Sequence, residues 1–134
     1  MIAAWSRPAS LVVDGQRIVS DVPPVTRARE AFVPLRAVGE SLGAQTTYDP
    51  RSGLVEVIRG SDTLRMHLGD RMATLNGSPM TLTVAPFAVR GRTMVALNVI
   101  SRAFNSKVQY DDGRAKIDVV SPGLIEAGAQ QDAP

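Results

Sequence analysis

A degenerate internal repeat is the feature that most constrains how this chain can fold. The segment AFVPLRAVGESLGAQTTYD at residues 31–49 returns as TMVALNVISRAFNSKVQYD at residues 93–111, and the shift of 62 positions holds without a gap from Val13–Ile58 to Leu75–Val120. A unit of about 60 residues buries only about 60% of the surface that its unfolded chain exposes. We therefore predict that the two copies share one core and do not fold separately.

Each copy has the pattern of one short helix. Apolar residues at i, i+3 and i+7 mark one helical face in both copies: Leu35, Val38 and Leu42 in the first, and Leu97, Ile100 and Phe104 in the second. Gly43 and Asn105 follow these faces at equivalent positions, and both residue types readily adopt the left-handed conformation that ends a helix. No Ser, Thr or Asp marks the helix starts. Since such short helices need tertiary packing, the six apolar residues should be buried together.

The remainder of each copy has the pattern of β-hairpins. Asp14-Gly15 and Asn76-Gly77 are strong turn signals before the helices, and Asp112-Gly113 is another after the second helix. Pro-containing strands are expected at 22–26 and 84–89, placed at an edge or a bulge because proline cannot donate to a central ladder.

The predicted fold class is therefore α+β: two tandem β-rich repeats, each with hairpins, one short helix and a C-terminal β-hairpin, packed as one compact domain. Alternating apolar residues between the copies predict a structural strand there and not a flexible tether. The expected boundaries are a lead-in at 1–10, repeat 1 at 11–60, a connecting strand at 61–72, repeat 2 at 73–121 and a flexible tail at 122–134.

Charge and composition argue against several classes of partner. The net charge is +2, and the thirteen Arg and two Lys are spread along the chain among Asp and Glu. Nucleic-acid binding would need clustered positive charge, so we expect no nucleic-acid partner. The chain has no Cys, which excludes disulfides and thiolate metal sites. The absence of a long apolar run predicts no membrane insertion, and the N-terminus lacks the pattern of a signal peptide.

No arrangement of residues typical of catalysis is present. Asp49 and Asp111 occupy equivalent positions and could form a carboxylate pair, but Asp at the start of a turn commonly bonds its own backbone, and we favour that interpretation. His67, the single His, falls on the polar side of a strand and is expected at the surface. An enzyme of unrecognised type would have to use these three residues and Asp112. We predict no catalytic residue, no metal site and no cofactor.

Arginines near two loop tips are the best candidates for a charged binding surface. Arg27 and Arg29 in the first copy correspond to a similar pair, Arg90 and Arg92, in the second. Arginine forks suit carboxylates and phosphates, although a solvated turn is the simpler interpretation. A shared face for the four would favour binding, and opposite ends would weigh against it. Further candidates are Arg36, Tyr48 and Tyr110.

A family resemblance rests on the first copy. The run Phe32-Val33-Pro34-Leu35-Arg36-Ala37-Val38, continuing to Leu42-Gly43-Ala44, Tyr48-Asp49 and Val55-Glu56-Val57-Ile58, resembles the copper amine oxidase N-terminal-like domain, over roughly residues 11–121. The second copy departs from the pattern at Ala96, Asn98 and Asn105.

The resemblance implies a small α+β stalk-like module, appended to exported bacterial proteins or standing alone. The amine oxidase catalytic domain is a separate region that holds copper with three His, whereas this chain has one His. We therefore expect a non-catalytic, secreted or cell-envelope module that binds another envelope protein or a cell-wall polymer, or acts as a spacer. The second hypothesis is a binding domain for an anionic glycan or peptide that uses the arginine-bearing tips.

Overall fold

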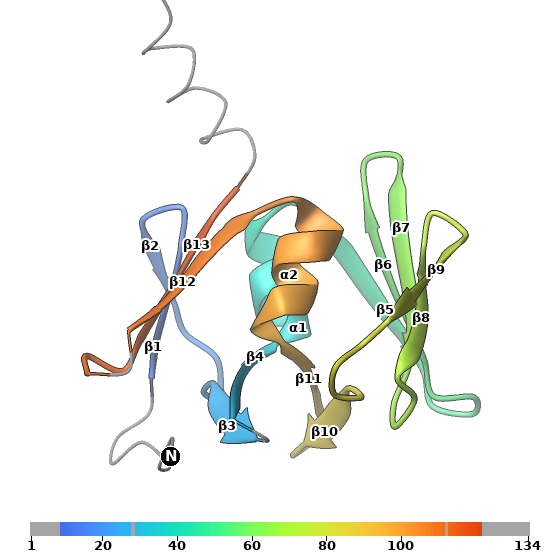
Figure 1. The fold of residues 1–134 in the computed structure, drawn as a ribbon, viewed down its shortest axis with the longest axis horizontal. Helices are drawn as coiled ribbons and strands as arrows, with labels where there is room; N and C mark the ends of the chain where they lie inside the picture. Colours follow the sequence, from blue (N-terminus) through green and yellow to red (C-terminus); the bar gives the residue numbers. More distant parts are fainter. Residues whose placement is uncertain (1–8, 28, 112, 122–134) are drawn as a thin grey trace, which may run out of the picture.

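A computed structural model describes residues 9–27, 29–111 and 113–121. Most of the expected lead-in, the expected tail at 122–134 and Asp112 lie outside the described residues. The described parts form thirteen strands and two helices, which confirms the predicted α+β class. Two outer sheets flank the helices, and a third sheet lies beneath them (Figure 1).

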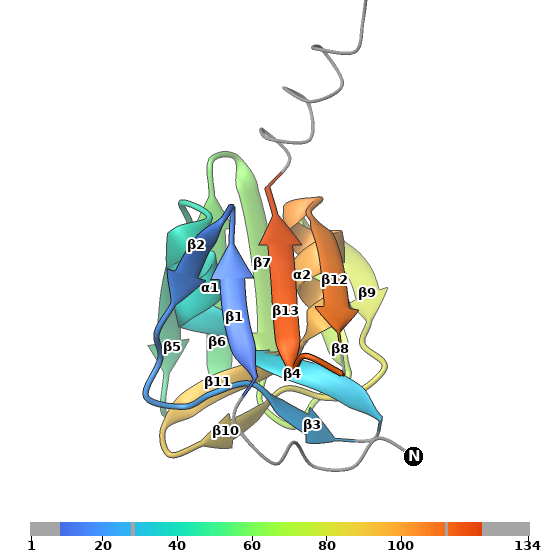
Figure 2. The ribbon, with the colours of Figure 1, turned by 90° about the vertical axis from the view of Figure 1, so that its left-hand side faces the viewer.

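Sheet A has four strands and combines the beginning and the end of the described chain. Its strand order is β12-β13-β1-β2, and Figure 2 shows this sheet facing the viewer. The parallel pair β1–β13 lies at its centre, flanked by antiparallel pairs. The strands are β1 (Ser10–Val13), β2 (Gln16–Ile18), β12 (Lys107–Asp111) and β13 (Lys116–Val120).

Sheet C is a continuous five-stranded antiparallel meander. Its central strand is the connecting segment between the copies, so the prediction of a structural strand there is confirmed. The strands are β5 (Gln45–Asp49), β6 (Leu54–Arg59), β7 (Asp62–His67), β8 (Met72–Leu75) and β9 (Ser78–Thr81).

Sheet B, in the order β10-β11-β4-β3, connects to both helices. Strand β4 runs directly into helix α1, and β11 runs directly into α2. The elements are β3 (Val25–Arg27), β4 (Glu30–Pro34), α1 (Leu35–Ser41), β10 (Phe87–Val89), β11 (Arg92–Ala96) and α2 (Leu97–Phe104). Neither helix is long and apolar enough to cross a membrane, and this holds for the described residues.

The two copies have the same elements in the same order. Strand β1 begins at Ser10 and β8 begins at Met72, 62 positions later, and the same offset relates β4 to β11. The antiparallel pair β4–β11 aligns Val33 with Val95, which are equivalent residues. An approximate two-fold axis therefore passes between them, and each outer sheet takes one hairpin from each copy.

The predicted core is confirmed. All six apolar helix residues are buried and belong to one hydrophobic cluster: Leu35, Val38, Leu42, Leu97, Ile100 and Phe104. The inner faces of both outer sheets contribute to the same cluster, so the copies share one core.

The ends of the elements follow local chemistry. Gly43, just after α1, has φ +84°, and Asn105 caps α2 in the left-handed conformation with φ 50° and ψ 41°. The N-caps, Pro34 and Ala96, make no side-chain capping bond. The proline-containing strands begin later than predicted, at Val25 and Phe87, because the prolines before them cannot donate to a ladder.

Candidate binding groove

One groove of about 500 Å³ lies between helix α1, the edge of sheet C and two connections from sheets A and B. Its lining comes from both copies, so it exists only in the assembled domain. The residues are Val19, Ser20 and Asp21 before β3; Pro34, Arg36, Ala37 and Glu40 along α1; Thr46, Tyr48 and Val55 in sheet C; and Gly91, Arg92 and Thr93 at the start of β11.

The charges that line the groove are balanced. Arg36 and Arg92 are positive, and Asp21 and Glu40 are negative. Only Asp21 and Arg92 form an ion pair with each other, and neither Arg36 nor Glu40 has an ionic partner among the described residues. Within the described part of the chain, the groove therefore offers one guanidinium and one carboxylate on the same helix that form no ion pair.

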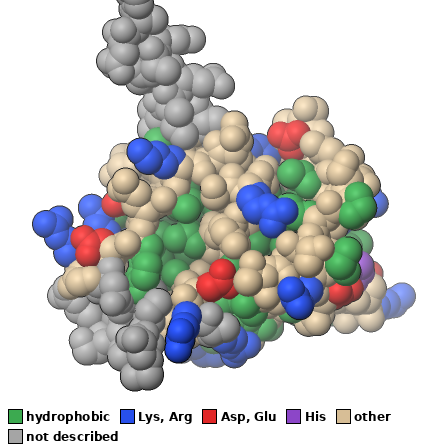
Figure 3. All heavy atoms as spheres, in the orientation of Figure 1, with side chains coloured by type: hydrophobic (Ala, Val, Ile, Leu, Met, Phe, Trp, Pro, Cys, Tyr) green, Lys and Arg blue, Asp and Glu red, His purple; other side chains and the backbone are tan. Residues whose placement is uncertain are grey.

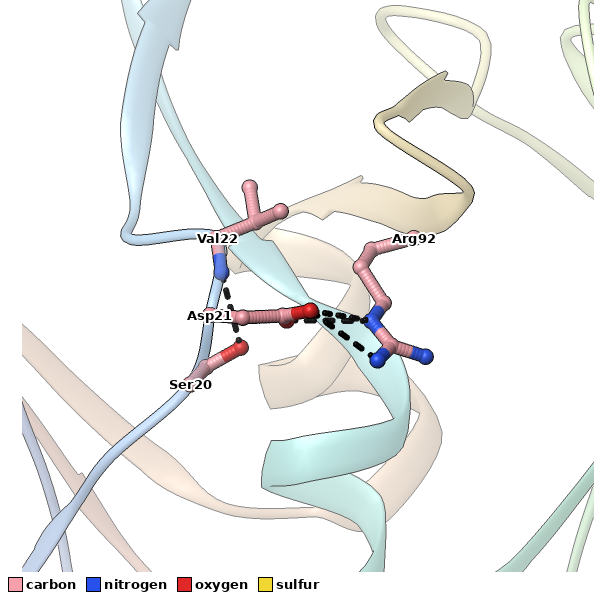
Figure 4. Close-up of polar contacts among 4 residues, drawn as sticks. All are labelled: Ser20, Asp21, Val22 and Arg92. Atoms are coloured by element: carbon pink, nitrogen blue, oxygen red, sulfur yellow. Dashed lines mark hydrogen bonds and ion pairs between the residues drawn. The ribbon is translucent and has the colours of Figure 1, made fainter.

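The Asp21–Arg92 pair joins the two copies across the mouth of the groove (Figure 4). The Nε of Arg92 donates to Oδ1 of Asp21 at 3.0 Å, and its Nη2 donates to Oδ2 at 3.0 Å, a two-pronged geometry. The hydrogen bonds from Arg92 hold the pKa of the Asp21 carboxyl below its usual value, and the carboxylate in turn raises the pKa of Arg92. Both side chains are half exposed, so water screens the pair.

Arg36 ties α1 to the edge strand β5. Its Nη2 donates to the backbone carbonyl oxygen of Thr46 at 3.3 Å. The Oγ1 of Thr46 is buried and has no hydrogen-bond partner among the described residues. The helix approaches closely here, since a Cβ placed on Gly39 would lie 3.4 Å from that oxygen.

Two apolar side chains stand exposed at the groove. Val19 is 87% exposed and Tyr48 is 46% exposed, and the large hydrophobic residues exposed elsewhere in the described chain are Ile58 and Met72. Exposed apolar side chains that gather beside charged ones are typical of a surface that meets a partner.

The structure brings three of the seven predicted binding residues together. Arg36, Tyr48 and Arg92 line the groove. Tyr110 lies in sheet A instead, beside a shallow hollow over the β12–β13 hairpin. The guanidinium of Arg27 stacks 3.6 Å from the centre of the Phe87 ring, where it links the two copies.

The two arginine-bearing tips do not share one face. Strands β4 and β11 are antiparallel, so the turn before Glu30 lies at one end of this pair and the turn before Arg92 lies at the other. Figure 2 shows the β3–β4 and β10–β11 connections at opposite sides of sheet B. Arg27 and Arg29 are therefore separated from Arg90 and Arg92, and the hypothesis of a single four-arginine surface is not supported.

Most residues of the groove were not anticipated from the sequence, among them two carboxylates and a buried hydroxyl. Asp21, Glu40 and Thr46 come from different elements, and each reaches the groove through the tertiary fold. No local signal pointed to Asp21, because its ionic partner Arg92 lies 71 positions away in the sequence.

The carboxylates at the ends of the hairpin strands stabilise turns, as predicted. Asp49 accepts a hydrogen bond from the backbone N–H of Arg51 at 2.9 Å and one from the hydroxyl of Ser52 at 3.0 Å. Asp111 accepts one from the backbone N–H of Arg114 at 3.1 Å. The two carboxylates lie in different outer sheets and do not form a pair. His67 is exposed at the end of β7.

The donor set does not fit a copper site. Tight copper binding needs several nitrogen or sulfur ligands in fixed geometry, and the chain has one His and no Cys. Among the described residues, no three His, Cys, Asp or Glu side chains gather closely enough to hold a metal ion.

On the face seen in Figure 3, Lys and Arg side chains are scattered and form no single patch.

Comparison with known proteins places the chain in a family. No curated protein gives a significant match. The family model of the copper amine oxidase N-terminal domain matches residues 12–119, which is most of the chain. That family is a non-catalytic, stalk-like module. The chain therefore belongs to the copper amine oxidase N-terminal domain family.

Proposed function

We propose that the protein is a non-catalytic, exported or cell-envelope module that binds another envelope protein or a cell-wall polymer through the groove beside α1. The observation that carries this proposal is the convergence of Arg36, Arg92 and Tyr48 in one groove of about 500 Å³. Each comes from a different element, and the groove combines them with the exposed side chain of Val19.

The chemistry of the groove supports binding. A pocket of this size with an apolar part and a few convergent polar groups is typical of a ligand site. Catalysis would need a nucleophile with a base, or a cluster of carboxylates, within hydrogen-bond reach. The groove contains neither, since its acids, Asp21 and Glu40, face an arginine partner or solvent.

A cross-linking experiment in intact cells tests the proposal. A photo-reactive phenylalanine analogue replaces Tyr48 in the groove, and the matched control places it at Met72, which is 52% exposed on β8 outside the groove. We expect an adduct from position 48 and none from position 72, with the protein recovered outside the cytosol. Recovery of the native protein wholly in the cytosol would contradict the location, and equal labelling from both positions would contradict the groove.

The second hypothesis, an anionic glycan or peptide bound by the arginine-bearing tips, is weaker. Four arginines on one face would have favoured it, but the two arginine-bearing tips lie at opposite ends of the β4–β11 pair. An acidic ligand would also meet Asp21 and Glu40 beside Arg36 and Arg92 in the groove. Charge balance favours a partner that carries apolar and charged groups together.

A further inference from the structure

We propose that the groove receives an extended peptide segment of a partner protein, which adds as a strand to the free edge of β5 and places one acidic side chain against Arg36. This inference deepens the proposed function and rests on it. The argument starts from the position of β5, which is an edge strand of sheet C and pairs only with β6 among the described strands.

The backbone of β5 has open hydrogen-bonding groups on this edge. In an antiparallel pair, successive residues point their N–H and C=O groups alternately toward and away from the neighbouring strand. The carbonyl of Thr46 accepts a hydrogen bond from the Arg36 side chain, so the backbone N–H and C=O of Thr46 point away from β6. The carbonyl of Asp49 accepts one from the N–H of Gly53 in the hairpin loop, so the backbone groups of Asp49 point toward β6. By this alternation the backbone groups of Tyr48 point away from β6, and they have no partner among the described residues.

An added strand would extend sheet C beside the groove. Its side chains would alternate between the two faces, as those of β5 do. Thr46 and Tyr48 are two residues apart and both line the groove. Every second side chain of the added strand would therefore enter the groove, where it meets α1 and the loop that carries Val19.

The lining defines which side chains fit. Arg36 uses Nη2 for Thr46 and has no acidic partner among the described residues, so its guanidinium can take a carboxylate. The Nη1 of Arg92 also has no partner there and points away from Asp21 in Figure 4. Val19 and Tyr48 offer apolar surface. The matching segment has an acidic residue and an apolar residue two positions apart.

The equivalent edge in the second copy has a different character. Strand β12 is the corresponding edge strand of sheet A, and it carries Lys107 where β5 carries Gln45. Charged side chains, Lys above all, protect an edge against pairing with another chain. The uncharged Gln45 of β5 provides no such protection, so the edge of β5 is more open to an added strand than the equivalent edge of β12.

The probe for the test is a blocked octapeptide of alternating threonine and valine in which one central valine is replaced by glutamate, so that valine lies two positions from the acid on the same face, with a lysine version as its control. We expect the glutamate peptide to shift the Tyr48 amide resonance in ¹⁵N spectra of the full chain and to slow its hydrogen exchange. Tyr48→Pro removes the outward N–H without touching the β5–β6 ladder and should abolish binding, whereas Tyr48→Ala should retain it at lower affinity.

A charge-matched pair of variants tests the acidic contact independently. Arg36→Gln should lower affinity for the glutamate peptide about tenfold, and Arg51→Gln, an equal charge change on the exposed β5–β6 loop, should leave it unchanged. If Tyr48→Pro does not fold, this pair decides the question. Absence of binding by the glutamate peptide, equal binding by Tyr48→Pro, or equal effects of the two Arg variants would overturn the proposal. A cellular adduct from position 48 to a polysaccharide would overturn it as well while leaving the broader binding function intact.

Discussion

The two outer sheets are built from equivalent hairpins, yet they close in different ways. In sheet C, strand β7 lies between the two hairpins and makes antiparallel pairs with both. In sheet A no strand intervenes among the described residues, and β1 pairs directly with β13 in parallel. The inner strands of the two hairpins are parallel to each other in both sheets, but only sheet C has a further strand between them. The direct pairing in sheet A brings together residues that are far apart in the sequence, since Ser10 pairs with Lys116.

One turn position performs the same task in both sheets. In sheet A, the Oδ1 of Asp14 accepts a hydrogen bond from the backbone N–H of Ser121 at 2.7 Å. In sheet C, the equivalent Asn76 uses its Oδ1 to accept one from Thr63 at 2.7 Å. Both residues have positive φ, which Asn and Asp tolerate better than most residues. In each sheet, the turn residue therefore accepts a hydrogen bond from the backbone of the segment that lies beside its hairpin.

The largest effect is expected in the shared core. Leu35 is 0% exposed on α1, which leads into sheet C, and Leu97 is 8% exposed on α2, which leads into sheet A. Leu35→Ala and Leu97→Ala should each lower the free energy of unfolding by about 2–5 kcal/mol, with the larger loss for Leu35. Denaturant titration should show one transition in both variants, and Ile58→Ala at the surface serves as the control. Separate transitions for the two sheets, or unchanged stability in both variants, would contradict a shared core.

A matched pair of valines compares the outer sheets directly. Val119 in β13 and Val57 in β6 are equivalent positions, and they are 1% and 2% exposed. Either change to Ala should cost about 1–3 kcal/mol. Hydrogen exchange should distinguish them: Val119→Ala should expose the amides of sheet A while sheet C stays protected, because sheet A depends on contacts between distant segments. Equal loss of amide protection in both sheets would show that the direct pairing in sheet A is as stable as the pairing through β7 in sheet C.

The turn residues should produce a smaller effect. Asp14→Ala and Asn76→Ala each remove a bond to a neighbouring strand and put Ala at a positive φ, at a cost of about 1–2 kcal/mol. Asn76 also donates from Nδ2 to Asp62 at 2.9 Å, so its loss should be the greater. Thermal unfolding measures both, and Asp14→Asn, which keeps the acceptor, should stay near the wild type. A stability loss in Asp14→Asn equal to that in Asp14→Ala would refute this role.

The smallest effect concerns acid stability at the groove. The folded-state pKa of Asp21 is lowered by Arg92, so the stabilisation is present above the unfolded value and is lost as pH falls through the folded value. Asp21→Asn should therefore be slightly less stable than wild type near neutral pH, and the two should converge below the ordinary aspartate value of 3.8. Chemical denaturation across this range measures the difference, with Glu40→Gln as the control. A gap that persists in acid would point to a cause other than ionisation.

The elements of the fold could be predicted from the sequence because their signals are local. Helical spacing, a residue that adopts positive φ after each helix and Asp-Gly or Asn-Gly turns each act within a few residues. The pairing of β1 with β13 had no such signal, since nothing near Leu11 indicates Ile117 as its partner. The repeat predicts two similar halves, but it does not say that each outer sheet takes its hairpins from both.

The groove was predictable only in part for the same reason. Arg36, Tyr48 and Arg92 stood out as residue types that bind ligands, and the fold brings them together. Arg27, Arg29 and Arg90 looked equivalent in the sequence, but the antiparallel register of β4 and β11 sends the two tips to opposite ends. Asp21 was missed because its importance comes from a partner 71 positions away.

The parallel joint in sheet A also determines how the domain would respond to mechanical load. Strands β1 and β13 lie side by side and run in the same direction, so Ser10 and Val120 emerge at opposite ends of the pair. Tension applied through these two points would slide the strands past each other in shear, and their hydrogen bonds would have to break together. A joint pulled open from one end loses its bonds one at a time and resists far less. This arrangement places the strongest resistance of the domain to extension along the line between Ser10 and Val120.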